Sequence, residues 1–120
     1  MRVGTWNIGS MSGRGTEVCE ELRKRRMDVC CLQEVRWRGQ GALFLGMRSR
    51  RYKLWRFGNS DGTGGVGVLV KEELCEKVVE VRRRSDRVMT VVMVLEEEVL
   101  RIICVWSTEW QNGCIARAFL

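Results

Sequence analysis

The chain has 120 residues, a net charge of +6 and 45% hydrophobic residues, which suits one globular domain and leaves no room for two. It contains no histidine, which excludes His general bases, Ser–His and Cys–His pairs, and zinc sites with imidazole ligands. It contains no proline either. A complete hydrolase usually needs at least one of these two residue types, so the composition indicates a piece of one.

Positive charge is concentrated in the first half of the chain. Residues 1–60 carry 13 basic and 5 acidic side chains, whereas residues 61–120 carry 8 and 10. A basic half favours a polyanionic partner, most simply nucleic acid, for which the family resemblance given below implies DNA. A solvated basic surface without any partner would have the same composition.

The cysteines and the N-terminus bear on the cellular compartment. None of the six cysteines forms a C-x-x-C pair, so we expect no zinc site and mostly small buried thiols in a reducing compartment. The first dozen residues lack the apolar core of a signal peptide, and the longest apolar run, residues 88–95, is too short to span a bilayer. We expect an intracellular protein, nuclear or cytoplasmic, without a membrane partner; the oligomeric state is left open.

The first elements in chain order form a crossover unit. Residues 2–7 predict a buried strand, and residues 9–15 a glycine- and serine-rich loop. Thr16 is predicted to cap a helix that runs to about Arg26, with acidic residues first and basic residues last. Residues 28–33 are apolar on both faces, which indicates a strand in a sheet covered on both sides.

From Arg36 onward the pattern is typical of β-structure. Strands are predicted at residues 51–57, 66–70, 78–84, 88–95 and 100–106. Residues 59–65 predict a loop with turns, and residues 96–98 a hairpin bend. The expected order is therefore strand–helix–strand followed by a series of strands, within one domain.

Two polar residues end the first two strands. Asn7 closes the first and Glu34 the second, where a parallel sheet places its ligands. A carboxylate after four apolar residues is costly to bury without a cation, and Mg²⁺ suits one or two carboxylates together with phosphate oxygens. Each residue taken alone has a plainer interpretation, with Asn7 closing a turn and Glu34 beginning a loop.

Residues 36–57 combine cations and aromatic rings without any acidic residue. Arginines contact phosphates and planar rings stack on bases, so the composition suits nucleic acid. The alternative is that the aromatic side chains face the core, which we favour for Tyr52, Trp55 and Phe57, while the cations face solvent. The candidate nucleic-acid-binding residues are Arg36, Arg38, Arg48, Arg50, Arg51, Lys53 and Arg56.

Four motifs together resemble one family. They are T-W-N-I-G at residues 5–9, D-V-C-C-L-Q-E-V-R-W-R-G at 28–39, G-G-V-G-V-L-V at 64–70 and S-D-R-V-M at 85–89. In this order and spacing they are similar to the endonuclease/exonuclease/phosphatase superfamily, especially to the branch of non-LTR retrotransposons and craniofacial development protein 2. The resemblance covers residues 1 to about 104.

The resemblance implies a fold and a chemistry. The fold is an α/β class, four-layer sandwich of two β-sheets flanked by helices, of which this chain supplies the N-terminal half. The activity is phosphodiester hydrolysis dependent on Mg²⁺ or Mn²⁺, in which an Asp-polarised His activates water. Glu34 would ligate the metal, and Asn7 would position the scissile phosphate and support the metal site, so both are candidate catalytic and metal residues. The glycines at positions 64, 65 and 67 and the pair Asp86 and Arg87 would be structural.

The chain also departs from the family pattern. Gly9 stands where some relatives carry an acidic residue, and the later Asp-x-Asn pair, a further aspartate and the terminal Asp-His have no counterpart. From Val105 the family continues with other residues, and a one-base shift of permitted codons restores Tyr-Gly-Pro-Gln-Ser-Gly-Lys-Met-Asp. We therefore divide the chain into residues 1–104, part of the family domain, and residues 105–120, a divergent tail read out of frame.

Three functions follow from these observations. The first is a truncated magnesium-dependent endonuclease-like domain of retrotransposon ancestry, which we expect to be inactive as this chain and to bind metal weakly. The second is a non-catalytic basic fragment that holds nucleic acid through residues 36–56. The third is a degenerate element product without a role.

Overall fold

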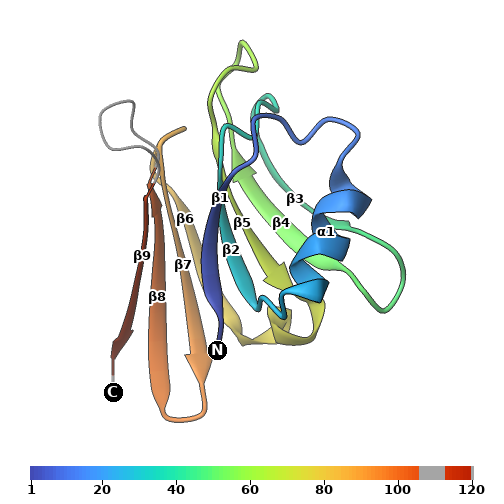
Figure 1. Ribbon diagram of the computed structural model, residues 1–120. Coiled ribbons are helices and arrows are strands. Elements are labelled where there is room, and N and C mark those ends of the chain that lie inside the picture. Colours follow the sequence, from blue (N-terminus) through green and yellow to red (C-terminus); the bar gives the residue numbers. More distant parts are fainter. Residues whose placement is uncertain (106–112, 120) are drawn as a thin grey trace.

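The chain folds into two packed β-sheets with one helix on the outside. The structure, a computed structural model, describes residues 1–105 and the backbone of residues 113–119. Sheet A has the strand order β1-β2-β5-β4-β3, and sheet B has the order β6-β7-β8-β9. Figure 1 shows helix α1 over one face of sheet A and sheet B on its other side. The strands of sheet A are β1 (Val3–Asn7), β2 (Val29–Gln33), β3 (Gln40–Leu45), β4 (Tyr52–Phe57) and β5 (Val66–Lys71). Those of sheet B are β6 (Val78–Arg83), β7 (Val88–Leu95), β8 (Glu98–Val105) and β9 (Gly113–Phe119).

Strand β2 is the centre of the fold because both of its faces are buried. All five of its residues are inaccessible, as the uninterrupted apolar run predicted. Cys30 and Leu32 pack toward α1, whereas Val29 and Cys31 pack toward sheet B. The alternation follows from the two-residue period of a strand, so this one segment joins the two cores. The expected fold class is confirmed: the described residues form three layers of an incomplete α/β sandwich.

Helix α1 (Gly15–Lys24) covers the outer face of sheet A with Val18, Cys19 and Leu22. The prediction that Thr16 caps this helix is wrong, because the helix already includes Thr16 and Arg14 occupies the N-cap position without a side-chain capping bond. The Arg14 guanidinium instead donates to the Ile8 carbonyl at 2.8 Å, which ties the helix start to the preceding loop. The loop contact therefore decides where the helix begins.

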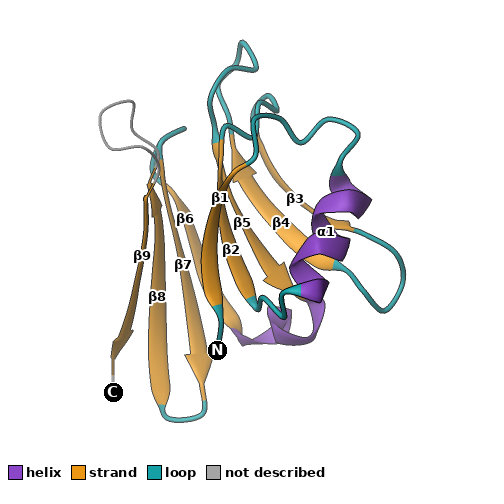
Figure 2. Cartoon of the chain, viewed as in Figure 1, coloured by secondary structure: helices purple, strands orange, loops and turns teal. Residues whose placement is uncertain are grey.

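Strand β3 is the element that the sequence analysis did not identify. It is an edge strand that pairs antiparallel with β4, and Gly41 weakens the pattern by which strands are recognised. A short 3-10 helix, η1 (Glu72–Lys77), was not expected either and connects the two sheets (Figure 2). Strand β9, in the segment that the sequence analysis treated as a divergent tail, was not predicted either. The other strands match the predicted ones to within two residues.

Sheet B packs its apolar face against β2 and β5. Met89, Val91 and Ile102 lie in this second core, and residues 96–97 make the expected bend between β7 and β8. In the described parts, residues 1–105 and 113–119, no helix is long and apolar enough to cross a bilayer. Residues 106–112 and 120 lie outside the description, so the out-of-frame interpretation of the tail stays a prediction.

Candidate metal and nucleic-acid site

The parallel pairing of β1 with β2 brings the two predicted site residues to one edge of sheet A. Asn7, the last residue of β1, is the register partner of Gln33, and Glu34 follows directly on the neighbouring strand. The Ile8 amide donates to the Gln33 carbonyl at 3.0 Å, so the two segments stay together beyond the end of β1. Asn7 is exposed, and the Glu34 side chain keeps 28% of its accessible surface.

Glu34 begins a loop whose backbone is unusual. Glu34 and Arg36 both have φ of 57°, in the left-handed region that side chains other than glycine rarely occupy. Between them Val35 is buried, and the Arg36 amide donates to the Gly64 carbonyl at 2.8 Å. Strained backbone of this kind persists only where the surroundings determine it, and it concentrates at functional sites. The loop therefore holds the Glu34 carboxylate in one defined place.

The glycines of the motif at residues 64–70 explain how the chain can pass so close to its neighbours. Gly64 and Gly65 have φ of 58° and 93°, and a Cβ on Gly65 would lie 3.2 Å from the backbone of Phe57 and Gly58. On Gly67 a Cβ would lie 2.8 Å from a methyl carbon of Leu54. The family motif at residues 64–70 thus has a packing reason, in line with the structural role expected for it.

The charges around Glu34 leave room for a cation. The nearest basic group is Arg36, whose Nη2 lies 3.9 Å from Glu34 Oε2, and both side chains are partly exposed. Within the described residues no three His, Cys, Asp or Glu side chains gather as a metal-binding group. Asn7 and Glu34 together offer an amide oxygen and a carboxylate, which are hard oxygen donors. This set fits an Mg²⁺ ion that keeps water and takes phosphate oxygens as its other ligands.

Gln33 is a residue of this edge that the sequence analysis did not single out. Its side chain is completely buried between the sheets, and its Nε2 donates to Thr5 Oγ1 at 2.8 Å and to Cys104 Sγ at 3.9 Å. It thereby links β1 and β8 directly below Glu34. A polar residue at the end of an otherwise apolar buried run was the signal available for finding it.

The structure separates the seven candidate nucleic-acid-binding cations into two groups. Arg36, Arg38 and Arg56 lie toward the edge that carries Glu34, because β4 runs in the same direction as β2 and ends at the same edge of the sheet, with β5 between them. Arg48, Arg50, Arg51 and Lys53 lie in or beside the loop between β3 and β4, toward the other end of the sheet.

Two cations of the second group are paired with carboxylates. Arg50 Nε lies 3.0 Å from Glu20 Oε1, and Arg51 Nη2 lies 2.6 Å from Glu72 Oε1. The first group includes Arg56, whose guanidinium carbon lies 5.2 Å from the centre of the Trp37 ring. The segment is thus not one continuous basic patch.

The aromatic residues of the segment divide as expected. Tyr52 is inaccessible and Trp55 is 9% exposed, so both belong to the core, and Phe57 packs against the core between the sheets. Tyr52 donates from its hydroxyl to the Met27 carbonyl at 2.6 Å, and burial raises its pKa to about 12. Phe44, by contrast, keeps 42% of its surface exposed.

Asp86 and Arg87 lie in the tight connection between β6 and β7. The amides of Arg84 and Ser85 donate to the Val88 carbonyl at 3.1 and 3.3 Å, which closes the turn. The Arg87 amide donates to Ser85 Oγ at 3.1 Å. This geometry agrees with a structural role for the S-D-R segment.

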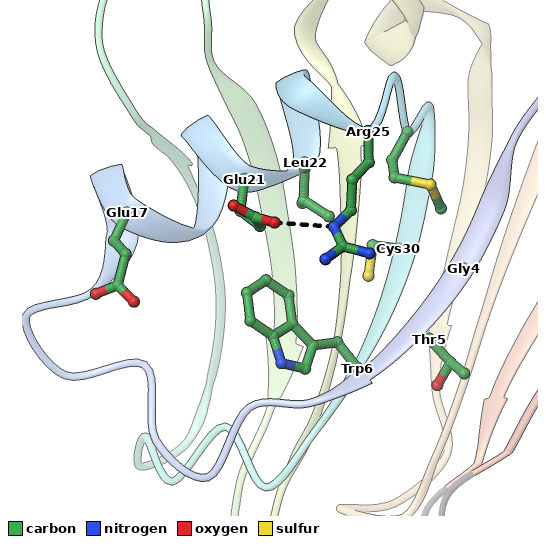
Figure 3. Close-up of a pocket in the computed structure, with 9 residues that line it drawn as sticks. Gly4, Thr5, Trp6, Glu17, Glu21, Leu22, Arg25 and Cys30 are labelled. Atoms are coloured by element: carbon green, nitrogen blue, oxygen red, sulfur yellow. Dashed lines mark hydrogen bonds and ion pairs between the residues drawn. The ribbon is translucent and has the colours of Figure 1, made fainter.

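A hollow of about 480 Å³ lies between α1 and β1, away from the Glu34 edge. Figure 3 shows Trp6 and Leu22 on its walls and the Glu21–Arg25 ion pair across its mouth, with Nε 2.9 Å from Oε1. Neither Asn7 nor Glu34 lines it. Glu17, the other charged residue of the lining, forms an ion pair with Arg14 at 3.2 Å. The three charged side chains that line the hollow are therefore all engaged in ion pairs. It contributes no reactive group to the candidate site.

Comparison with known proteins agrees with this geometry. Craniofacial development protein 2 of Bos taurus is 25% identical over 91 residues, which is 74% of this chain, and the chain spans 15% of the length of that relative. The profile of the Endonuclease/Exonuclease/phosphatase family matches residues 4–107, which include both strands, Asn7, Glu34 and the glycine segment. The chain therefore belongs to the Endonuclease/Exonuclease/phosphatase family.

Proposed function

We propose that this chain carries the metal- and phosphate-binding part of a magnesium-dependent nucleic-acid phosphodiesterase site and does not hydrolyse nucleic acid by itself. Asn7 and Glu34 are the residues assigned to it. One observation carries the proposal: the two side chains stand at the carboxyl ends of paired parallel strands, and Glu34 is held there by strained backbone. Family membership supports nucleic-acid phosphodiesters as the substrate class.

The metal would be held by the Glu34 carboxylate, with Asn7 beside it. When bound, Mg²⁺ supplies charge stabilisation for oxygens of the phosphate. The protein's part is to fix the backbone from which the carboxylate projects, and the Val35 and Arg36 amides do this by donating to the Gly65 and Gly64 carbonyls. Arg36 and Arg38, which follow Glu34 in the loop, are placed to meet neighbouring phosphates.

The inactivity of the chain by itself follows from its composition. With no histidine, it has no imidazole that could take a proton from water near neutral pH. One carboxylate with one amide can hold a metal and a phosphate, but it provides no separate base. We also infer that the domain descends from a non-LTR retrotransposon, which the four ordered motifs support. The nucleotide sequence around the Val105 codon can test the separate inference that the tail is read out of frame.

The decisive experiment measures DNA binding and DNA cleavage side by side. We expect no nicking of supercoiled plasmid by the wild-type chain in Mg²⁺. Anisotropy of a short fluorescent duplex should show severalfold tighter binding in Mg²⁺ than in EDTA. Glu34→Ala and Asn7→Ala should remove this metal effect, whereas Glu97→Ala, an exposed carboxylate in the β7–β8 hairpin, should retain it.

Two outcomes would contradict the proposal. Plasmid nicking that disappears in Glu34→Ala would show that the chain is an active nuclease. Binding that is independent of both Mg²⁺ and Glu34, and that falls steeply with salt, would favour the second candidate function, a basic fragment that holds nucleic acid through its cations alone.

A further inference from the structure

Strand β3 carries an aromatic ring that the core does not use. Phe44 is 42% exposed although it lies within a strand pair, next to the last residue of β3 and opposite Lys53 of β4. Lys53 shares a face of β4 with Trp55 and Phe57, which pack into the core between the sheets. Phe44 therefore projects from the face of sheet A that sheet B covers over β5 and β4 but leaves accessible at β3.

Cations surround this ring. Arg51 lies with its guanidinium carbon 4.9 Å from the centre of the Phe44 ring, and Lys53 lies with Nζ at 5.5 Å. Arg51 is fixed by Glu72, which accepts from its Nη2 and Nε at 2.6 and 3.3 Å. Within the described residues Lys53 forms no ion pair, and its Nζ lies 4.9 Å from the centre of the Trp55 ring.

A second cation reaches the same face from sheet B. Arg83, at the end of β6, donates from Nε to the Arg56 carbonyl and from Nη2 to the Gly41 carbonyl, both at 3.1 Å. It has no carboxylate partner within the described part of the chain, and burial together with the nearby Arg56 lowers its pKa. Gly41 precedes Phe44 by three residues, which is about 10 Å along a strand.

We propose that Phe44, Lys53 and Arg83 form a binding surface for single-stranded nucleic acid on the open face of β3 and β4. A base stacks on the Phe44 ring, and the phosphates that flank it meet the Lys53 ammonium and the Arg83 guanidinium. Lys53 is the mobile member, because its flexible side chain rests on two rings and is not held by an acid. Paired bases of a duplex cannot present their faces to the ring, so the surface selects unpaired strands.

This inference rests on the proposed nucleic-acid partner but not on the metal site. The surface lies on the face of sheet A toward sheet B. Phe44 and Lys53 lie at the end of the sheet where β4 begins, whereas Glu34 lies at the opposite end, where β2 finishes. The two sites can therefore be inactivated separately. Loss of one leaves the other measurable.

The test is fluorescence anisotropy of a short labelled oligothymidine and of a matched duplex, both in EDTA, with the full chain. Phe44→Ala and Phe44→Leu should weaken binding of the single strand about tenfold, the usual effect of losing one stacked base, and Phe44→Trp should preserve it. Lys53→Gln should lower the salt dependence by about one counterion. Met47→Ala, an exposed apolar residue in the adjacent loop, and Lys24→Gln, an exposed cation on α1, are the controls.

Unchanged single-strand affinity in Phe44→Leu, or an equal loss in Met47→Ala, would overturn the inference. Equal weakening of duplex and single strand by Phe44→Ala would also contradict it, since stacking would then not be the cause. Glu34→Ala should bind oligothymidine in EDTA as the wild type does. A failed metal effect beside an intact Phe44 effect would therefore count against the proposed active site alone.

Discussion

Backbone bonds join separate segments at both ends of sheet A, but the end opposite Glu34 adds ion pairs between side chains of different elements. At the Glu34 end, backbone groups of separate loops bond to one another, as Met11 does to Val35 at 3.0 Å and Gly58 to Gly39 at 2.8 Å. At the other end, side chains pair across elements. Arg23 donates two bonds of 2.8 Å to Glu73, and Arg50 and Arg51 have carboxylates of their own.

The difference separates structural charge from charge available to a ligand. At the end of sheet A opposite Glu34, ion pairs engage two of the seven candidate cations, Arg50 and Arg51. Exposed pairs of this kind add little stability each. At the Glu34 end of sheet A, backbone bonds fix the loops, so side chains such as Asn7 and Glu34 are available to point at a ligand. The cations of a basic segment therefore have to be sorted into those that pair with carboxylates and those that do not, before a binding role is assigned to them.

The largest effect should come from breaking the backbone packing at the Glu34 end. A Cβ on Gly58 would overlap the Trp37 carbonyl, so Gly58→Ala forces the loop after Glu34 to move. We expect a loss of more than about 3 kcal/mol in the free energy of unfolding, measured by urea denaturation. Gly13→Ala is the control, since Gly13 has φ of 69° but open space around it and should cost only about 1 kcal/mol. Equal losses in the two variants would refute the packing argument.

A smaller effect should come from acid at the other end. The hydrogen bonds from Arg23 hold the pKa of Glu73 at about 2, below its ordinary 4.5. A lowered pKa in the folded state adds stability above pH 4.5, and this stability is lost as the pH falls toward 2. Because the Glu73 side chain is 56% exposed, we expect Glu73→Gln to cost only about 1 kcal/mol at neutral pH.

The variant should also flatten the acid dependence of unfolding between pH 4.5 and 2, followed by circular dichroism. Glu97→Gln, in the exposed hairpin, is the matched control and should leave the profile unchanged. Parallel profiles for the wild type and Glu73→Gln would mean that the pair with Arg23 contributes nothing to folding.

The smallest effect concerns Glu34 and has the opposite sign. Glycine adopts φ of 57° without strain, so Glu34→Gly should raise the free energy of unfolding by about 0.5 kcal/mol, after its greater freedom in the unfolded chain is counted. Glu34→Ala keeps the strain and should bring no gain. Thermal unfolding of both variants checks this, and a destabilised Glu34→Gly would show that the carboxylate supports the fold.

Much of the fold could be predicted because strong periodic signals coincide with buried strands. The apolar run of β2 and the alternation in β4 identified both elements, and the placement of Asn7 beside Glu34 followed from the parallel crossover. Strand β3 was missed because its exposure alternates while its residue types do not: Ala42 and Phe44 occupy the exposed positions of this edge strand. The Thr16 cap failed because Arg14 bonds to the preceding loop, a contact that local propensity does not include.

The residues of the two proposed sites also fall into those that the sequence could identify and those that it could not. Sequence could identify Asn7 and Glu34, since a polar residue after an apolar strand is visible in the one-dimensional pattern. Gln33, Phe44 and Arg83 could not be assigned roles, because their partners are distant along the chain. Gln33 meets Cys104 of β8, and Arg83 meets Gly41 of β3.

The amino-acid sequence by itself determined the strand–helix–strand unit at the start of the chain, the family and the pair of residues at the strand ends, because these depend on local pattern and on the geometry of one crossover. Only the tertiary structure decided which cations are neutralised and which remain available. Electrostatic pairing depends on distances of a few ångströms between segments far apart in the chain, and these distances exist only once both sheets are packed.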